Sequence, residues 1–132
     1  AIGAKVLTRK GLAAILVWKA PELASQATGP AAVFEDIVNL NERRDIITVV
    51  RSGVMAGDPV TRSFGAERSV TPRELQAVLD RLAGALGRRP LTWCKEDDGR
   101  VCVAVPAAVD GATAAALTDD LVGGEDTPCR PR

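Results

Sequence analysis

The stretch Leu12-Ala-Ala-Ile-Leu-Val-Trp18 is a continuous apolar run that is followed at once by Lys-Ala-Pro. A short apolar run that ends at a turn signal is typical of a β-strand covered on both faces. A helix continuing from residue 4 is the alternative, in which one face would carry Leu7, Gly11, Ala14, Ile15 and Trp18. The strand interpretation decides the fold, because the later elements are then arranged around a sheet.

The next two segments are predicted to be a helix and a second strand. A helix is expected from Thr28-Gly-Pro to about Arg44, and its buried side would carry Val33, Phe34, Ile37, Val38 and Leu40. The β-branched stretch Asp45-Ile-Ile-Thr-Val-Val50 then predicts a buried strand. Strand, helix and strand in this order favour a right-handed crossover between two parallel strands.

An edge strand and a well-delimited helix follow. The edge strand is expected where Val60, Arg62, Phe64 and Ala66 alternate with polar or small residues. Thr71-Pro-Arg-Glu74 is a capping box with proline at the first helical position, and Val70 is placed to pack on Leu75. The apolar stripe of this helix and its C-terminal cap are Leu75, Val78, Leu79, Leu82, Leu86 and Gly87.

Residues 91–105 predict a β-hairpin around the loop Asp97-Asp98-Gly99, in which the glycine takes a left-handed conformation. This register places Trp93 opposite Val103 on one face. The other face carries Thr92, Cys94, Glu96, Arg100, Cys102 and Ala104. A last helix is expected after Asp110, with Ala114, Leu117 and Leu121 on one side and Gly123-Gly124 at its end.

The predicted order is therefore β-α-β-β-α-β-β-α, which is an α+β (two-layer α/β) fold with a mixed sheet. Its first six elements match a ferredoxin-like sandwich, and the last hairpin and helix extend it. Residues 1–122 are expected to form a single domain, and residues 123–132 a disordered C-terminal tail with nothing to bury.

The composition disfavours several classes of function. The chain contains no histidine, which removes the Ser-His-Asp and Cys-His nucleophile systems and the imidazole metal ligand. Its 17 basic and 17 acidic side chains balance, so no overall charge attracts nucleic acid. No cofactor, metal or nucleic-acid partner is therefore expected, and an enzyme is less favoured than a binding protein.

Cys94 and Cys102 lie opposite each other on the outer face of the predicted hairpin. Their Cα atoms would be about 5.5 Å apart, which permits a disulfide. A strained, exposed disulfide is readily reduced and can act as a redox switch, with Cys129 as a third thiol. The alternative, which we favour, is that the two are small side chains packed beneath a helix or a partner.

Two cations follow the two predicted parallel strands. Lys19 and Arg51 would emerge at the same edge of the sheet, beside a loop that contains Ser52 and two glycines. Open α/β sheets bind ligands at this edge, and two cations there suit a carboxylate or a phosphate. Neither a Walker lysine nor a G-x-G-x-x-G motif is present, and solvated loop charges are the simpler interpretation.

By elimination, the leading hypothesis is a non-catalytic module that binds another protein or itself as a homodimer. A regulatory, adaptor, immunity-type or assembly subunit would fit. It would act through the edge strand and the outer hairpin face. The predicted partner-binding residues are Val60, Arg62, Phe64, Thr92, Glu96 and Arg100.

The alternative hypotheses come from other classes of protein. One is a thiol-dependent redox sensor that uses Cys94 and Cys102. A weaker one is an enzyme that binds an anion at Lys19, Arg51 and Ser52. No stretch of the sequence is long enough to span a bilayer, and a cytoplasmic location is expected.

Overall fold

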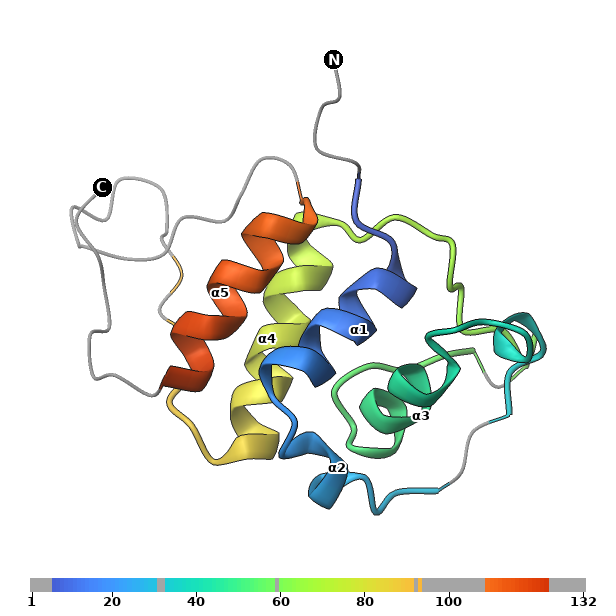
Figure 1. Ribbon diagram of the computed structural model, residues 1–132, viewed down its shortest axis with the longest axis horizontal. Coiled ribbons are helices and arrows are strands. Elements are labelled where there is room, and N and C mark those ends of the chain that lie inside the picture. The colour runs from blue at the N-terminus through green and yellow to red at the C-terminus, as the bar shows by residue number, and fades with distance from the viewer. Residues whose placement is uncertain (1–5, 31–32, 59, 92, 94–108, 124–132) are drawn as a thin grey trace.

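The computed structural model describes residues 6–30, 33–58, 60–91, 93 and 109–123. Within these residues the protein is helical (Figure 1). The helices are α1 (Arg9–Lys19), α2 (Leu23–Gln26), the 3-10 helix η1 (Glu35–Ile37), α3 (Arg43–Arg51), α4 (Pro72–Leu86) and α5 (Gly111–Gly123). The described part contains no sheet, only the isolated bridges Val6–Asp110, Thr8–Ser69 and Asp58–Ser63.

Helix α1 lies at the centre of the bundle, with α5 on one side and α3 on the other (Figure 1). Its residues Leu12, Ala13 and Leu16 are completely buried. Helix α4 packs against α5, and the short α2 contacts both α3 and α4. This arrangement leaves the long connection between α3 and α4 at the α3 end of the molecule.

The predictions for α4 and α5 are confirmed. The Thr71 hydroxyl accepts a hydrogen bond from the Glu74 amide at 3.0 Å, and Gly87 ends α4 in the left-handed conformation at φ 64°. An oxygen of Asp110 accepts from the Thr113 amide at 2.7 Å and caps α5. Both helices bury the predicted side, although Leu86 and Leu117 are only partly covered.

The predicted strand at residues 12–18 is wrong, because this run lies inside α1. The Thr8 hydroxyl accepts from the Gly11 amide at 3.3 Å and begins the helix. The helical alternative has the right secondary structure but the wrong face, since Leu12 and Leu16 are buried while Trp18 is 69% exposed. A run that is apolar at every position has no period, so its pattern cannot distinguish a strand from a buried helix.

The predicted helix at 28–44 and the predicted strand at 46–50 are also wrong. The first segment is mostly irregular, with a single turn at η1, and Val33 and Val38 are exposed. The second is α3, in which Ile46 and Val49 are completely buried. Two buried residues three positions apart fit one face of a helix. The packing of that face in the core overrides the preference of β-branched side chains for strands.

The predicted edge strand at 60–66 is a loop. Asp58 and Ser63 pair through their backbones at 2.8 and 3.3 Å, and Arg62 adopts a φ of 56°. Val60 is 89% exposed, whereas Phe64 is buried. The α+β, ferredoxin-like fold is therefore wrong, and the described part of the chain is mainly helical.

The predicted hairpin lies outside the described residues except for Leu91 and Trp93, and the C-terminal tail beyond Gly123 lies outside them as well. Among the described helices, none has the length and apolar character needed to cross a membrane.

Candidate functional site

Two hollows lie on either side of Ala56 and Gly57, in the connection between α3 and α4. The larger, with a volume of about 610 Å³, is called the α3 groove here. Its apolar lining comes from Val33, Phe34, Val50 and Met55, and its polar lining from Gln26, Thr28, Arg51 and Ser52. The smaller, of about 490 Å³, is called the arginine pocket because Arg9 and Arg68 line it.

Two glycines fix the walls of the α3 groove. Gly29 and Arg51 are joined by a backbone hydrogen bond of 2.9 Å and by a 3.0 Å bond from Arg51 Nε to the Gly29 carbonyl. A Cβ at Gly29 would lie 2.7 Å from the Arg51 carbonyl oxygen. A Cβ at Gly57 would lie 2.3 Å from the ring of Phe34. Any larger residue at either glycine would force a wall to move.

Three valines between α2 and α4 are strongly exposed, and one of them, Val33, lines this groove. Val33, Val38 and Val60 are 66%, 58% and 89% exposed. They belong to two segments, 33–38 and 58–63, that are joined where the Glu35 amide donates to the Arg62 carbonyl at 2.9 Å (Figure 1). The groove therefore opens onto a surface that already carries unburied apolar side chains.

The loop tip that carries Val60 is held in a fixed shape. Asp58 Oδ1 accepts from the amides of Val60 at 2.8 Å and Thr61 at 3.3 Å. These bonds, from Val60 first and then from Thr61, hold the pKa of Asp58 below its ordinary value. Arg62 follows in the left-handed region, which is strained for a residue with a side chain. Such strain is often found in binding and switch segments.

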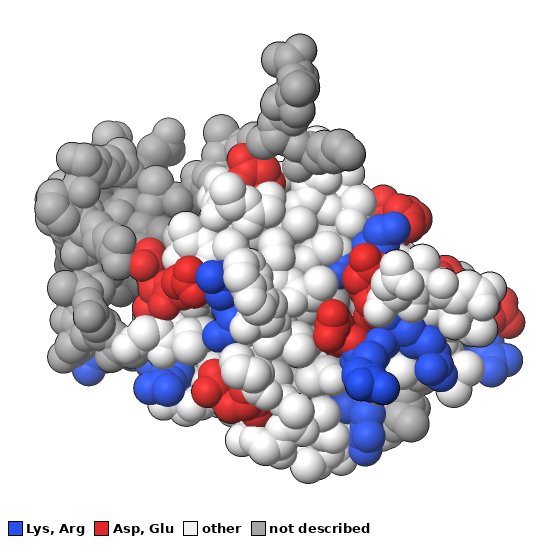
Figure 2. Space-filling view, viewed as in Figure 1, with Lys and Arg blue, Asp and Glu red and all other residues white. Residues whose placement is uncertain are grey.

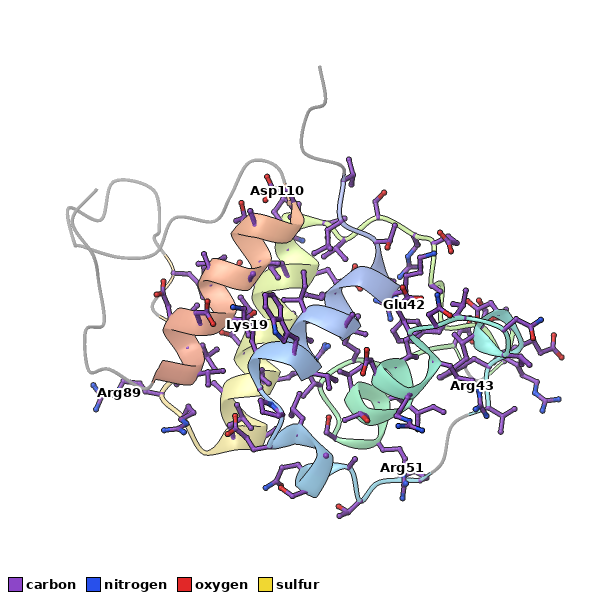
Figure 3. The ribbon with its side chains drawn as sticks, in the orientation of Figure 1. Lys19, Glu42, Arg43, Arg51, Arg89 and Asp110 are labelled. Carbon is purple, nitrogen blue, oxygen red and sulfur yellow. The ribbon has the colours of Figure 1, made fainter. Side chains whose placement is uncertain are left out.

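Arginines gather at α3. Figure 2 shows basic side chains over the α3 end of this face, with acidic ones among them, and Figure 3 places Arg43 and Arg51 at the two ends of the helix. Arg43 and Arg44 are exposed in its first turn. Cations there oppose the helix dipole, so the helix itself gives no reason for them. Within the described residues, neither forms an ion pair, and neither does Arg62.

The acid in the same turn of α3 is partly covered. Burial raises the pKa of Asp45, and the charge of Glu42 raises it further, while Arg44 lowers it. Arg44 thus compensates Asp45 only in part, and the first turn of α3 carries charges of both signs.

Arg9 is the buried centre of the arginine pocket. Only 5% of the residue is exposed, its Nε donates to the Phe64 carbonyl at 3.0 Å, and its guanidinium lies 4.6 Å from the centroid of the Phe64 ring. Its two terminal nitrogens bind the Ala56 carbonyl and the Glu74 carboxylate. Burial lowers the pKa of Arg9, and the positive charges of Arg68 and Arg81 lower it further.

A carboxylate braces the loop that forms the other wall of this pocket. Asp36 Oδ1 accepts from the Phe64 amide at 2.9 Å, and Oδ2 accepts from the amides of Gly65 at 2.9 Å and Ala66 at 3.0 Å. Burial alone would raise the pKa of Asp36, but the bonds from Ala66, Phe64 and Gly65 outweigh it and hold the pKa below its ordinary value. Three consecutive amides are thus fixed by one side chain.

The cations predicted from the sequence have different partners in the structure. Lys19 Nζ lies 3.1 Å from Asp119 of α5 and 3.9 Å from the centroid of the Trp18 ring, whereas Arg51 binds Gly29 (Figure 3). The sheet edge expected to unite them is absent from the described part of the chain. Arg51 and Ser52 do line a hollow, the α3 groove.

The predicted partner-binding residues that the structure describes differ in their exposure. Val60 and Arg62 are exposed on the loop, while Phe64 packs inside, with its ring centroid 5.8 Å from that of Phe34. The other residues proposed for partner binding or redox chemistry lie outside the described residues: Thr92, Glu96, Arg100, Cys94 and Cys102. No group of acidic or cysteine side chains within the described residues could hold a metal ion.

No pattern in the sequence pointed to Arg9 or Asp36 as functional residues. Arg9 pairs with Glu74 across 65 positions, and Asp36 reaches amides 28 to 30 positions away. No local spacing encodes contacts at such separations.

Comparison with protein families, curated proteins and solved structures found no match to this chain. The geometry of the two hollows is therefore the main indication of function.

Proposed function

We propose that this protein is a non-catalytic binding module that holds an acidic, extended segment of a partner protein in the α3 groove. The observations that carry the proposal are a groove with an apolar lining and three exposed arginines outside that lining, Arg43, Arg44 and Arg62, that form no ion pair within the described residues. A hydrophobic side chain of the partner would enter the groove between Val33 and Met55. Acidic residues on either side of it would pair with Arg43, Arg44 and Arg62.

The energetics of this surface suit a protein partner. Burying an exposed valine such as Val33 or Val60 contributes about 1.5 kcal/mol. Guanidinium groups bind carboxylates through two parallel hydrogen bonds, which adds specificity to that apolar term. Because the Gly29–Arg51 bonds hold a wall of the groove in place, the module loses little conformational entropy when it binds.

A protein segment fits better than a nucleic acid. Glu35, Glu42 and Asp45 lie on the segments around the arginines and would repel a phosphate backbone. The aromatic residue of the groove, Phe34, is 6% exposed and cannot stack on a base. The sequence as a whole carries no net positive charge.

The test is selection from a random peptide library on the immobilised protein, followed by affinity measurements on the enriched peptides. We expect Asp and Glu beside a Leu, Val or Phe, and affinity that falls as salt is added. The double variant Arg43→Gln/Arg44→Gln should weaken binding at least about tenfold, which is the loss of a single interaction of about 1.4 kcal/mol. The variant Val33→Ser should weaken it independently.

The matched control is Arg73→Gln/Arg88→Gln, which removes the same charge from exposed positions in α4 and just after it. This variant should bind the peptides like the unmodified protein. Equal loss in both double variants would mean that only net charge matters, and the proposal would be wrong. Preference for a single-stranded oligonucleotide over every enriched peptide would also overturn it, as would self-association through the groove in sedimentation experiments.

A further inference from the structure

Two arginines line the arginine pocket, and only one of them has a paired carboxylate within the described residues. Arg9 is paired with Glu74, but Arg68 is exposed and forms no ion pair within the described residues. Arg68 lines the same pocket as Arg9. The positive charges of Arg68 and of Arg81 on α4 both lower the pKa of Arg9. Three cations thus share this part of the molecule with Glu74, which pairs directly with Arg9, and with the carboxylates of Asp36 and Asp58.

Hydrogen-bond donors remain in the pocket. A guanidinium has five N–H groups, and Arg9 uses three of them, toward Phe64, Ala56 and Glu74. Ser63 Oγ accepts from the Gly65 amide at 3.2 Å, which leaves its own hydrogen to donate. The carbonyls that face Arg9 are already occupied.

The acid in the lining is compensated. Asp58 accepts from the amides of Val60 and Thr61, and the Thr61 hydroxyl hydrogen-bonds to it as well. These bonds do not remove its negative charge, but they direct Oδ1 into its own loop. The remaining N–H groups of Arg9, the Arg68 guanidinium and the Ser63 hydroxyl hydrogen have no acceptor among the described residues.

We propose that the arginine pocket binds a small molecule through a carboxylate or phosphate group, held by Arg68, by the remaining N–H groups of Arg9 and by the Ser63 hydroxyl. Both groups have the oxygen geometry that a planar guanidinium binds in a bidentate manner. The volume of about 490 Å³ lies in the range of small-molecule sites. This site is distinct from the α3 groove, which lies on the other side of Ala56 and Gly57.

The pocket is formed by the fold and not by loose surface charge. Arg9 is buried and fixed by contacts with Phe64, Ala56 and Glu74, so its orientation does not depend on a ligand. The opposite wall, at Gly65, is held by Asp36. Because Arg9 is already in place, of the two arginines only Arg68 has to be ordered when an oxyanion binds.

The test is a titration of the ¹⁵N-labelled full chain with inorganic phosphate and, separately, with acetate, at constant ionic strength set by chloride. We expect saturable shifts of the amide signals of Gly57, Thr61 and Gly65 and of the Arg9 Nε–H signal. Arg68→Gln should weaken the affinity at least about tenfold, the loss of one charge-assisted contact. The control Arg73→Gln removes the same charge from an exposed position on α4 and should leave the affinity unchanged.

The anion that saturates identifies the chemistry of the ligand: phosphate alone supports a phosphorylated compound, and acetate alone a carboxylate. Shifts that rise linearly with either anion and spread over all arginines would overturn the proposal, as would Arg68→Gln binding as tightly as the unmodified protein. Arg43→Gln/Arg44→Gln should keep the phosphate or acetate response, and Arg68→Gln should keep peptide binding. The two proposals can therefore fail separately.

Discussion

Asp36 is the residue on which the described site depends most. One carboxylate connects η1 to three successive amides, Phe64 to Ala66, and so holds the loop that forms a wall of the arginine pocket. Because a carboxylate only accepts hydrogen bonds, it can satisfy all three donors at once. Its contribution to the fold comes from these hydrogen bonds and not from burial, since the residue is exposed.

Asp36→Asn should therefore lower the free energy of unfolding at neutral pH by about 1–2 kcal/mol, allowing for solvent screening of a partly exposed group. An amide at this position turns a donor toward the loop amides. The folded protein holds the pKa of Asp36 below its ordinary value, so the stabilisation is complete above the unfolded pKa, about 3.9, and is lost as the pH falls through the lower folded value. The difference between the two proteins should shrink over the same fall in pH. Urea unfolding from pH 7 to pH 3 measures it.

The control is Glu35→Gln, an exposed neighbour on η1 that should leave stability within about 0.5 kcal/mol. If Asp36→Asn were as stable as Glu35→Gln at every pH, the three amide bonds would contribute nothing measurable.

At the scale of the elements, the helices predicted correctly are those with local signals at their ends. Helix α4 could be predicted because Thr71 and Pro72 mark its start and Gly87 its end, and α5 because Asp110 is a capping residue. For α1 and α3 the sequence pattern did not distinguish a helix from a strand. An all-apolar run and a β-branched run both favour strands locally, and only packing between the helices made them helical.

Glu74, the glutamate of the α4 capping box, also makes a long-range contact. In a capping box, the Glu at the third position reaches back to the start of its own helix, but Glu74 instead pairs with Arg9 of α1. One residue of the predicted motif thus joins two helices. The sequence indicated the cap, but not the pairing, because it depends on how α1 crosses α4.

Glu74→Gln should cost about 3 kcal/mol of unfolding free energy, because it leaves the buried guanidinium of Arg9 without its directly paired carboxylate. The matched control is Glu67→Gln, which breaks the pair with Lys10. That pair lies at the surface, with the Glu67 side chain 69% exposed, and is expected to contribute less than about 1 kcal/mol. Thermal unfolding of both variants measures the difference. Equal shifts in the two melting temperatures would show that the Arg9 pair is no stronger than a surface pair.

At the scale of the whole molecule, the segment before α1 is the point at which three helices begin side by side. The Leu7 amide donates to the Val109 carbonyl at 3.1 Å, and the Leu7 carbonyl accepts from the Val70 amide at 2.8 Å. The segment before α1 thus joins the starts of α4 and α5, while α1 itself separates α5 from α3 (Figure 1). The sequence did not predict this helical arrangement, because it depends on these distant contacts.

A bundle arranged around one buried helix should unfold in a single step. Leu16→Ala, at the completely buried centre of α1, should cost about 2–5 kcal/mol of unfolding free energy, whereas Trp18→Ala, 69% exposed on the same helix, should cost less than about 1 kcal/mol.

In the Trp18→Ala background the remaining tryptophan is Trp93, whose indole donates to Asp80 of α4 at 3.0 Å. Its fluorescence therefore reports on α4, while circular dichroism reports on all helices. Coincident urea transitions by the two probes, shifted together by Leu16→Ala, are expected if α1 connects the whole core. Separate transitions would mean that α4 and its neighbours unfold independently of α3, and the α3 groove and the arginine pocket would then have to be treated as parts of two cooperative units.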